Sequence, residues 1–246
     1  MTVPLGRRYG PEHLRVFTPE ERDRFRTDVP IDESTAWELL YRWEPELYDR
    51  LVAGERVHPG IWEVFPTRVG RALEVGAGTG RLTLELARRC EEVLAVEPAE
   101  PMRTILRSRA EADGLGDRVR VEPGFFDDLP APDGWADVVC SLSSFTPDPS
   151  HGGEPGLEEM ERVCRPGGII VLVWPYDRAW LEARGFTYRS FPGEMRLELR
   201  SPEEAVELAR IFYPHALAEV EALGSASVPY EILGINPPRD VAFKVK

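Results

Sequence analysis

The sequence has few cysteines, no long apolar run and no excess of positive charge. Its three cysteines are widely spaced, which fits neither a disulfide framework nor a cysteine-based zinc site. No apolar run approaches membrane-spanning length, and residues 1–10 contain no apolar signal core. We therefore expect a soluble, cytoplasmic protein without membrane contact. The four histidines are scattered along the chain, so we expect no metal site.

The charge balance disfavours one class of partner. The net charge is −13 at pH 7, with 43 acidic and 30 basic side chains. Because so acidic a surface repels phosphate backbones, we do not expect nucleic acid as a partner. The sequence leaves a homodimer open. At 246 residues and 42% hydrophobic content, the chain is long enough for one α/β domain with additional elements.

Apolar stretches alternate with helical patterns through the middle of the chain. The strand candidates are residues 72–75, 93–97, 119–121, 137–141 and 169–174, and the helix candidates between them are residues 81–89, 101–113 and 157–164. Strands that are apolar throughout and separated by helices predict a parallel sheet covered on both faces. We expect an α/β fold with a doubly wound sheet.

The flanking segments predict helices outside this sheet. Residues 32–54 carry large apolar side chains at helical spacing, with a break near Pro45, and form part of an N-terminal helical cap. After residue 174 we expect a half-exposed strand at 195–200, two helices and a last strand at 240–245. The expected organisation is one domain over 1–246, with the cap at 1–65, an α/β core at 66–246 and a helical insertion at about 201–224.

The most informative stretch is a glycine loop between a strand and a helix. Gly76, Gly78 and Gly80 are spaced as G-x-G-x-G, which differs from the G-x-G-x-x-G of a dinucleotide site and lacks the G-K-[ST] ending of a phosphate loop. Glu74 stands just before the loop, where a carboxylate repels a pyrophosphate and attracts an ammonium group. A tight turn that binds no ligand is the alternative interpretation.

A second carboxylate, Glu97, ends the next apolar run. At the carboxyl end of the second strand, a carboxylate can accept hydrogen bonds from both hydroxyls of a ribose. A surface acid without a ligand is the alternative. Together, Glu74 and Glu97 indicate a nucleoside-bearing cofactor that also carries a charged amino acid.

Four motifs in order resemble those of class I S-adenosylmethionine-dependent methyltransferases. They are Leu73–Gly80, Val93–Pro98, Asp128–Asp137 and Glu161–Gly168, and the resemblance covers about residues 71–174. It implies a Rossmann-like, seven-stranded, mostly parallel sheet with an antiparallel last strand. It also implies S-adenosylmethionine as the cofactor and S-adenosylhomocysteine as the product.

The resemblance assigns roles to individual residues. Glu74 would lie near the methionine ammonium group, Glu97 would hold the ribose, and Met102 would pack on the adenine. Gly76, Gly78 and Gly80 would line the nucleoside and methionine parts of the cofactor. The chain departs from the family at Phe125, where an aspartate commonly binds the adenine amino group. Either Asp127 takes that role, or Phe126 and main-chain groups hold the adenine.

The loop after the fourth strand is expected to face the transferred methyl group. It runs from Ser141, a candidate cofactor contact, to Gly153. Loops at the carboxyl ends of parallel strands form the ligand site in open sheets. His151 is the candidate catalytic base, because an imidazole can take up a proton near neutral pH. A solvated loop histidine is the alternative.

Several aromatic residues are candidates for binding the acceptor. They are Tyr41 and Trp43 in the cap, Trp174 and Tyr176 after the fifth strand, and Tyr213 in the late insertion. Core packing is the alternative role for the aromatic residues of the cap.

The function expected from these features is methyl transfer to a small-molecule acceptor, at an unresolved nitrogen, oxygen or carbon atom. Two alternatives remain open at this stage. One is an enzyme of the same fold that uses S-adenosylmethionine without transferring methyl, such as a cyclase or lyase. The other is a non-catalytic cofactor-binding module.

Overall fold

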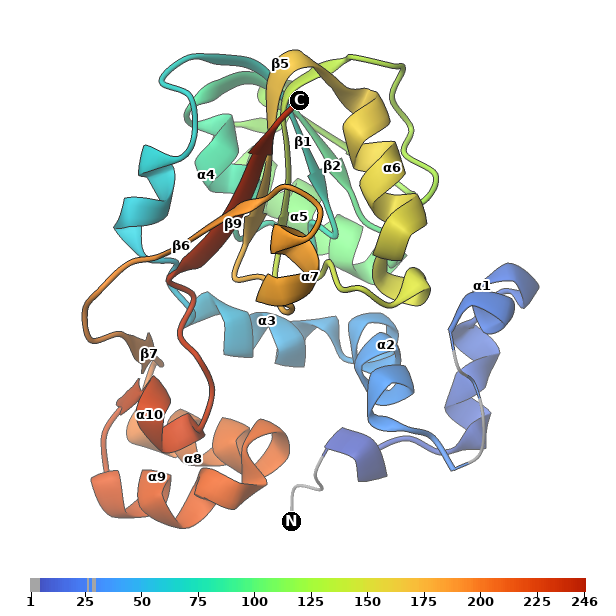
Figure 1. The fold of residues 1–246 in the computed structure, drawn as a ribbon. Coiled ribbons are helices and arrows are strands. Elements are labelled where there is room, and N and C mark those ends of the chain that lie inside the picture. Colours follow the sequence, from blue (N-terminus) through green and yellow to red (C-terminus); the bar gives the residue numbers. More distant parts are fainter. Residues whose placement is uncertain (1–4, 26, 28–29) are drawn as a thin grey trace. The chain divides into compact units, whose positions relative to one another are not determined.

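The computed structural model describes residues 5–25, 27 and 30–246, and the chain forms two compact units (Figure 1). The sheet unit consists of Val57–Pro192 and Pro238–Lys246. The helical unit consists of the described residues up to Arg56 together with Gly193–Pro237. The single domain expected over 1–246 stays a prediction.

The sheet unit contains a seven-stranded sheet in the order β3-β2-β1-β4-β5-β9-β6. Its strands are β1 (Val69–Val75), β2 (Cys90–Val96), β3 (Val119–Glu122), β4 (Ala136–Leu142), β5 (Cys164–Val173), β6 (Thr187–Ser190) and β9 (Asp240–Val245). The pairs from β3 to β5 are parallel. β9 is antiparallel to β5 and β6, and its arrow runs against that of β1 in Figure 1. The predicted mostly parallel sheet with an antiparallel last strand is confirmed.

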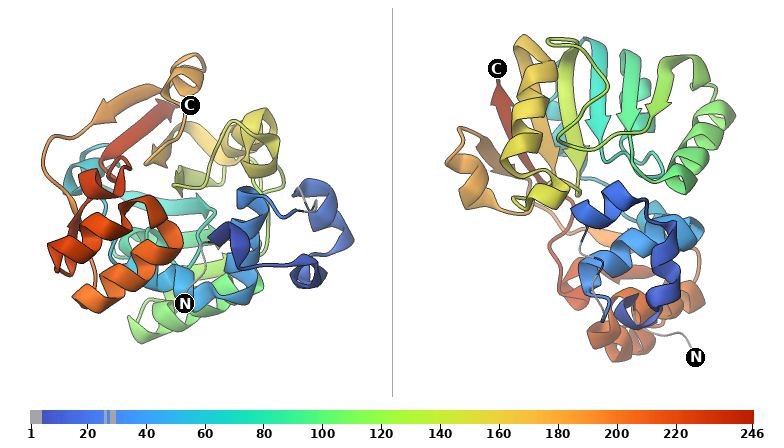
Figure 2. Two further views of the ribbon diagram at one scale, coloured as in Figure 1. Left: turned by 90° about the horizontal axis from the view of Figure 1, so that it is seen from below. Right: turned by 90° about the vertical axis from the view of Figure 1, so that its right-hand side faces the viewer.

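Helices cover both faces of this sheet. They are α4 (Thr83–Ala87), α5 (Glu100–Ala112), α6 (Gly153–Val163) and α7 (Arg178–Glu182), with short 3-10 turns η3 (Pro59–Glu63), η4 (Gly116–Arg118) and η5 (Pro149–His151). Leu86 of α4 packs with Val93, whereas Met160 of α6 packs in a different buried cluster with Leu94. Since successive residues of a strand point to opposite faces, α4 and α6 lie on opposite sides of the sheet. Figure 2 shows these layers from two further directions.

The order of the strands places a candidate ligand site. The chain passes from β1 to β2 and β3 on one side, and then returns to β4 on the other side of β1. Ligands of open α/β sheets bind outside the carboxyl ends of the strands at such a switch point. In this unit, the switch point is formed by the ends of β1, β2 and β4.

One predicted strand has a different partner in the structure, and one strand of the large sheet was not predicted. The strand expected at 195–200 is β7 (Arg196–Glu198), but it pairs with β8 (Ser227–Pro229) in a separate two-stranded sheet of the helical unit. The sixth strand of the large sheet is β6, an edge strand with mostly exposed residues and therefore no apolar signal. Residues 165–168, which end the last of the four motifs, lie within β5, where the pairing with β4 shifts register.

The helical unit begins with short capped helices. Its helices are α1 (Pro19–Arg24), α2 (Glu33–Trp43), α3 (Pro45–Ala53), α8 (Pro202–Phe212), α9 (Leu217–Leu223) and α10 (Tyr230–Leu233), with 3-10 turns η1 (Leu5–Arg7), η2 (Pro11–Val16) and η6 (Pro214–Ala216). Thr18 forms a capping box with Glu21, and Pro45 separates α2 from α3 as predicted. No helix among the described residues is long and apolar enough to cross a membrane.

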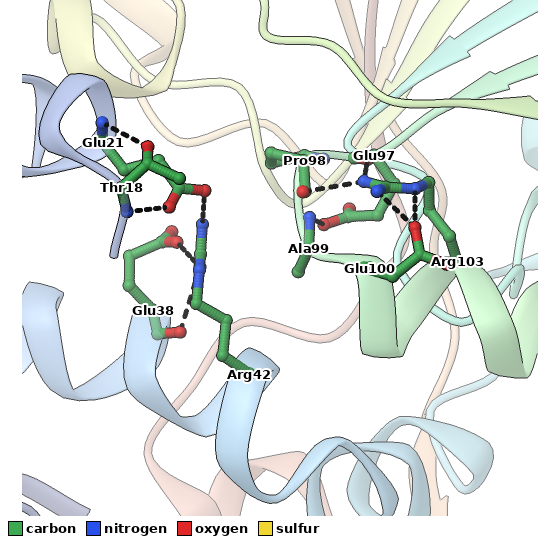
Figure 3. Close-up of polar contacts among 9 residues, drawn as sticks. All are labelled: Thr18, Glu21, Glu38, Arg42, Glu97, Pro98, Ala99, Glu100 and Arg103. Carbon is green, nitrogen blue, oxygen red and sulfur yellow. Dashed lines mark hydrogen bonds and ion pairs between the residues drawn. The ribbon is translucent and has the colours of Figure 1, made fainter. Parts of the chain in front are cut away.

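A buried arginine fixes the first segment of the helical unit to α2. The Arg42 guanidinium bonds Glu38 at 2.6 Å and Glu21 at 2.9 Å, as Figure 3 shows. It also lies 4.9 Å from the ring centroid of Phe17 and 5.4 Å from that of Phe25. Arg42 is paired with carboxylates and also stacked on aromatic rings, and these contacts offset the free-energy cost of burying its charge.

A second arginine joins helices that are distant in the sequence. Arg50 of α3 bonds Glu204 at 3.0 Å and Glu207 at 2.5 Å, both on α8. Glu204 also accepts hydrogen bonds from Arg200, which precedes α8. Burial alone would raise the pKa of Glu204, but the hydrogen bonds from Arg200 and Arg50 outweigh it and lower the pKa to about 2.

Candidate functional site

The glycine loop connects β1 to α4 in a conformation that suits glycine. Gly76, Gly78 and Gly80 have φ values of +69°, +56° and +95°, in the left-handed region that side chains disfavour. A Cβ atom at Gly76 would collide with Ser144 Oγ, and one at Gly80 would collide with Leu106. The close neighbours at these two positions therefore belong to the protein itself, and their predicted contacts with a cofactor stay a prediction.

Glu97 ties the end of β2 to the centre of the glycine loop. One carboxylate oxygen accepts a hydrogen bond from the Gly78 amide at 3.0 Å, and the other accepts one from the Ala99 amide at 2.9 Å. Figure 3 shows the Ala99 contact and the Arg103 guanidinium, which donates to the Glu97 carbonyl oxygen. These two amides fix the Glu97 carboxyl group at the end of β2 beside the glycine loop.

Glu74 is almost fully buried beneath the loop, with 1% of its surface exposed. The Thr83 hydroxyl donates a hydrogen bond to its carboxyl group at 2.5 Å. Burial raises the pKa of Glu74 to about 8, and the charge of Glu97 adds to this, while Thr83 and Arg81 act against it. An ammonium group bound beside Glu74 would favour its ionised form.

The carboxyl end of β4 lies against the glycine loop. Ser141 is buried, and its hydroxyl is 2.8 Å from that of Ser144. Ser143 and Trp174, which follow β4 and β5, are the non-glycine residues with left-handed φ values in the described chain, at 55° and 53°. Such strained conformations cluster at ligand-binding sites, and here they mark the ends of two adjacent strands.

The three residues predicted to contact the adenine, Phe126, Asp127 and Met102, differ in how deeply they are buried. Phe126 is partly buried, and its ring tip is 3.6 Å from the position that a Cβ atom of Gly76 would occupy. Asp127 is partly buried in the same segment. Met102 of α5 is nearly fully buried, with 2% of its surface exposed. The structure therefore brings Phe126 to the glycine loop, and the roles of Asp127 and Met102 stay predictions.

His151 lies in η5, in the loop between β4 and α6. Its ring is partly buried, and Nδ1 is 2.9 Å from the Ser150 hydroxyl. The backbone of the same loop is closed by a hydrogen bond from the Thr146 amide to the His151 carbonyl oxygen at 2.9 Å. The loop starts at Ser143, next to the serine that contacts Gly76, so His151 belongs to the same edge of the sheet.

The acceptor-binding candidates are divided between the two units. In the sheet unit, Trp174 follows β5 and has the Arg81 guanidinium 5.9 Å from its ring centroid, whereas Tyr176 is 65% exposed. In the helical unit, Tyr41 packs on Tyr48 at 5.0 Å between ring centroids. Trp43 donates a hydrogen bond to His13, and Tyr213 ends α8. The structure does not bring these five candidates together within one unit.

Three residues beside the loop were not among the site residues predicted from the sequence. Thr83 bonds Glu74, Ser144 contacts the glycine loop, and the charge of Arg81 acts on Glu74. Arg81 and Thr83 follow Gly80 directly, so their proximity to the loop was the available signal. Ser144 carries no such signal, because its contact with Gly76 depends on the turn of the backbone at Ser143.

The residues present fit the cofactor that the sequence suggests. A nucleoside linked to an amino acid needs acceptors for its ribose hydroxyls and for its ammonium group. Glu97, which bonds the amide at the loop centre, would supply the first, and the buried Glu74 would supply the second. The charge of Glu97 also acts on Glu74, which is consistent with both carboxyl groups lying near this edge of the sheet.

Comparisons with known proteins show which family the chain resembles. The family described as "Methyltransferase domain" matches residues 72–168. An uncharacterized methyltransferase of a Geobacillus species is 38% identical over 157 residues, covering 60% of this chain and 70% of that protein. An uncharacterized methyltransferase of Staphylococcus carnosus is 30% identical over 144 residues, covering 55% of this chain and 66% of that protein. The demethylmenaquinone methyltransferase of Thermus thermophilus is 39% identical over 108 residues, covering 43% of this chain and 47% of that protein.

A solved structure shows the same fold. The precorrin 8W decarboxylase of Methanobacterium thermoautotrophicum superposes with a TM-score of 0.50 and 19% identity, covering 78% of this chain and 97% of that one. The matched segments span about half to two thirds of the lengths of the three sequence relatives. From its ordered motifs, its seven-stranded sheet and these relatives, the chain belongs to the class I S-adenosylmethionine-dependent methyltransferase family.

Proposed function

We propose that this protein transfers a methyl group from S-adenosylmethionine to a small-molecule acceptor. The observation that carries the proposal is the Glu97 carboxylate, which bonds the Gly78 amide at the centre of the loop. This contact supports a role for Glu97 as the ribose acceptor beside the glycine loop. The cofactor's sulfonium makes its methyl carbon electrophilic, so the protein has mainly to align the acceptor with that carbon and exclude water.

The proposed roles follow from the positions of the side chains. Glu97 accepts the ribose hydroxyls, and Glu74 faces the ammonium group. Phe126 packs beside the adenine, and Gly76, Gly78 and Gly80 let the loop turn close to the ligand. Ser141, Met102 and Asp127 are proposed as further cofactor contacts. His151 is proposed as the base, on the loop that follows β4.

A small-molecule acceptor is supported by two observations. The net charge of −13 disfavours nucleic acid. The Thermus thermophilus relative is a methyltransferase for demethylmenaquinone, a small molecule. We propose that Trp174 and Tyr176 of the sheet unit contact the acceptor, and the same role stays a prediction for Tyr41, Trp43 and Tyr213. We also propose a cytoplasmic location, since the three cysteines are free thiols.

The proposal is tested by product analysis. The protein is incubated with S-adenosylmethionine and a panel of quinol, phenol and amine acceptors, and S-adenosylhomocysteine is quantified by mass spectrometry. We expect S-adenosylhomocysteine together with a product heavier by one methylene group. An altered acceptor without any S-adenosylhomocysteine would instead indicate a reaction of the cyclase or lyase type. Binding of S-adenosylhomocysteine without turnover of any acceptor would favour a non-catalytic module.

A further inference from the structure

Glu74 lies in an interior strand of the sheet and points to the face that α4 covers. Its backbone pairs with Ala95 of β2 on one side and with Cys140 of β4 on the other. Leu73 and Val75, which flank it in the chain, pack in the buried cluster on the α6 side. Because successive side chains of a strand point to opposite faces, the Glu74 side chain lies on the α4 side.

Thr83, the first residue of α4, supplies a hydrogen-bond donor on that side of the sheet. Its hydroxyl donates to Glu74 Oε2 at 2.5 Å, and Thr83 is itself fully buried, with 0% of its surface exposed. A donor stabilises an ionised carboxylate more than a protonated carboxyl group, because hydrogen bonds to charged groups are stronger. The Thr83 hydroxyl therefore favours the charged form of Glu74 and fixes the position of one of its oxygens.

The charged and titratable groups around Glu74 act on it in opposite directions. Burial raises the pKa of Glu74 to about 8, and the hydrogen bond from Thr83 is the strongest effect that opposes this rise. The charge of Arg81 in the glycine loop also lowers the pKa, whereas the charge of Glu97 raises it. Burial raises the pKa of the Cys140 thiol well above its ordinary value, so Cys140 is neutral at pH 7. Thr83 thus contributes more than Arg81 to the charged form of Glu74.

We propose that Thr83 is a positioning residue for the cofactor, whose hydroxyl orients Glu74 and supports its charged form, so that the site selects ligands that carry an ammonium group. This inference rests on the proposed function, because it requires Glu74 to face the ammonium group of S-adenosylmethionine. Thr83 acts through Glu74 and needs no contact with the ligand. A threonine that merely fills space in the core would contribute to stability without distinguishing one ligand from another.

The test compares two ligands that share a nucleoside and a thioether sulfur. S-Adenosylhomocysteine carries the amino-acid group, whereas 5′-methylthioadenosine has a methyl group in its place. Thr83→Val removes the hydroxyl and nearly keeps the shape of the side chain, and calorimetric titrations at pH 7 measure both affinities. S-Adenosylhomocysteine should bind to this variant about tenfold more weakly, because a hydrogen bond to the charged form of Glu74 is lost. 5′-Methylthioadenosine should bind as it does to the unaltered protein.

Further variants separate this role from a loss of folding. Thr83→Ser keeps the hydroxyl and should restore the affinity for S-adenosylhomocysteine. Glu74→Gln removes the charge on which Thr83 acts, so Thr83→Val combined with it should cause little further loss. Circular dichroism verifies that each variant is folded, and Thr83→Ala, which also lacks the hydroxyl, takes the place of Thr83→Val if that variant does not fold.

The ligand-free protein gives a second readout that does not depend on binding. The 13C signal of the Glu74 carboxyl group, identified by its absence in Glu74→Gln, is followed against pH in the labelled full chain. Removing the Thr83 hydroxyl should move the midpoint of this titration to higher pH, because the hydroxyl favours the ionised form. Thr83→Ser should have a midpoint close to that of the unaltered protein.

Two results would overturn the inference. One is an equal titration midpoint of Glu74 with and without the Thr83 hydroxyl. The other is an equal loss of affinity for S-adenosylhomocysteine and 5′-methylthioadenosine in Thr83→Val, which would assign Thr83 a purely structural role. If the unaltered protein bound neither ligand, the proposed function itself would be contradicted, and the titration midpoint would still decide whether Thr83 supports the charge of Glu74.

Discussion

The Glu97 carboxylate accepts a hydrogen bond from the Gly78 amide at 3.0 Å, which joins the end of β2 to the centre of the glycine loop. The contact has two consequences. It holds the loop in place, and it fixes the orientation of a carboxylate at the position where a ribose is expected. The same residue therefore contributes to the shape of the site and to its chemistry.

Replacing Glu97 should weaken binding of S-adenosylhomocysteine. In Glu97→Ala, the loss of the ribose hydrogen bonds to a charged group should reduce affinity by about 1–3 kcal/mol, or roughly 5- to 150-fold. Isothermal titration calorimetry measures this change. The matched control is Glu91→Gln, an exposed acid of the same strand that should leave affinity unchanged. Equal affinities in all three proteins would remove Glu97 from the site.

Replacing Gly78 should abolish binding for a different reason. Gly78 has a φ of +56°, so a β-branched side chain strains the loop and obstructs the ligand. Gly78→Val should lose detectable S-adenosylhomocysteine binding and keep the circular dichroism spectrum of a folded protein. Gly114→Val serves as the control, since Gly114 has a similar φ of +68° and open space around it. If the two variants bind equally well, the loop assignment is wrong.

Binding of the cofactor should release a proton from Glu74. The pKa of Glu74 is raised to about 8 from 4.5, so the group is largely protonated at neutral pH before an ammonium group arrives. A bound cation lowers that pKa, and affinity should therefore rise with pH toward 8, by at most about tenfold per pH unit. Arg81, Glu97 and Cys140 are the other ionisable groups that interact with Glu74.

Calorimetric titrations at pH 7 in two buffers of different ionisation enthalpy count the protons released. We expect net release in the unaltered protein and a loss of that release in Glu74→Gln. The same raised pKa predicts that Glu74 makes the free protein less stable as pH rises from 4.5 to 8, because the folded state holds the proton more tightly. Equal proton release by both proteins would assign the titration to another group.

The helical unit should lose stability in acid through Glu204. Its pKa of about 2 lies below the ordinary value of 4.5, so its ion pairs with Arg50 and Arg200 stabilise the fold fully above pH 4.5. As pH falls from 4.5 toward 2, up to about 3 kcal/mol should be lost. Urea unfolding at a series of pH values measures this. Glu204→Gln should reduce this loss of stability in acid, and Glu219→Gln, at an exposed position of the same unit, should not; identical profiles would contradict the assignment.

The catalytic role of His151 predicts a large kinetic effect. A general base commonly contributes about 10²-fold or more to the rate, so His151→Gln should lower kcat by that factor with any hydroxyl or carbon-acid acceptor that is turned over. KM for S-adenosylmethionine should change little, because His151 is not proposed to hold the cofactor. Turnover within about twofold of the unaltered protein would exclude His151 as the base.

The parallel part of the sheet could be predicted because burial leaves a pattern in the sequence. Val93 and Leu94 are both fully buried, on opposite faces of β2, and such strands are apolar throughout. β6 could not be found in this way, since Thr187–Ser190 is a mostly exposed edge strand. The alternation of apolar and polar residues around Leu197 did predict the strand β7. This pattern does not identify the strand with which β7 pairs, which is β8.

The candidate site was predictable to the extent that its residues flank the glycine loop. Glu74 and Glu97 stand at strand ends in the sequence, and the structure brings both carboxyl groups to the loop. The contact of Ser144 with Gly76 depends on a left-handed backbone conformation at Ser143. A serine does not predict that conformation. The 2.9 Å contact between the Ser150 hydroxyl and His151 Nδ1 similarly depends on the turn of η5.

The most direct test of the central claim is a calorimetric titration of the unaltered protein with S-adenosylhomocysteine. If the carboxyl groups of Glu74 and Glu97 hold an amino-acid-bearing nucleoside at the glycine loop, the titration shows saturable binding at one site per chain. Adenosine alone, which lacks the ammonium group, should bind more weakly. The absence of saturable heat up to about 1 mM ligand would contradict the account.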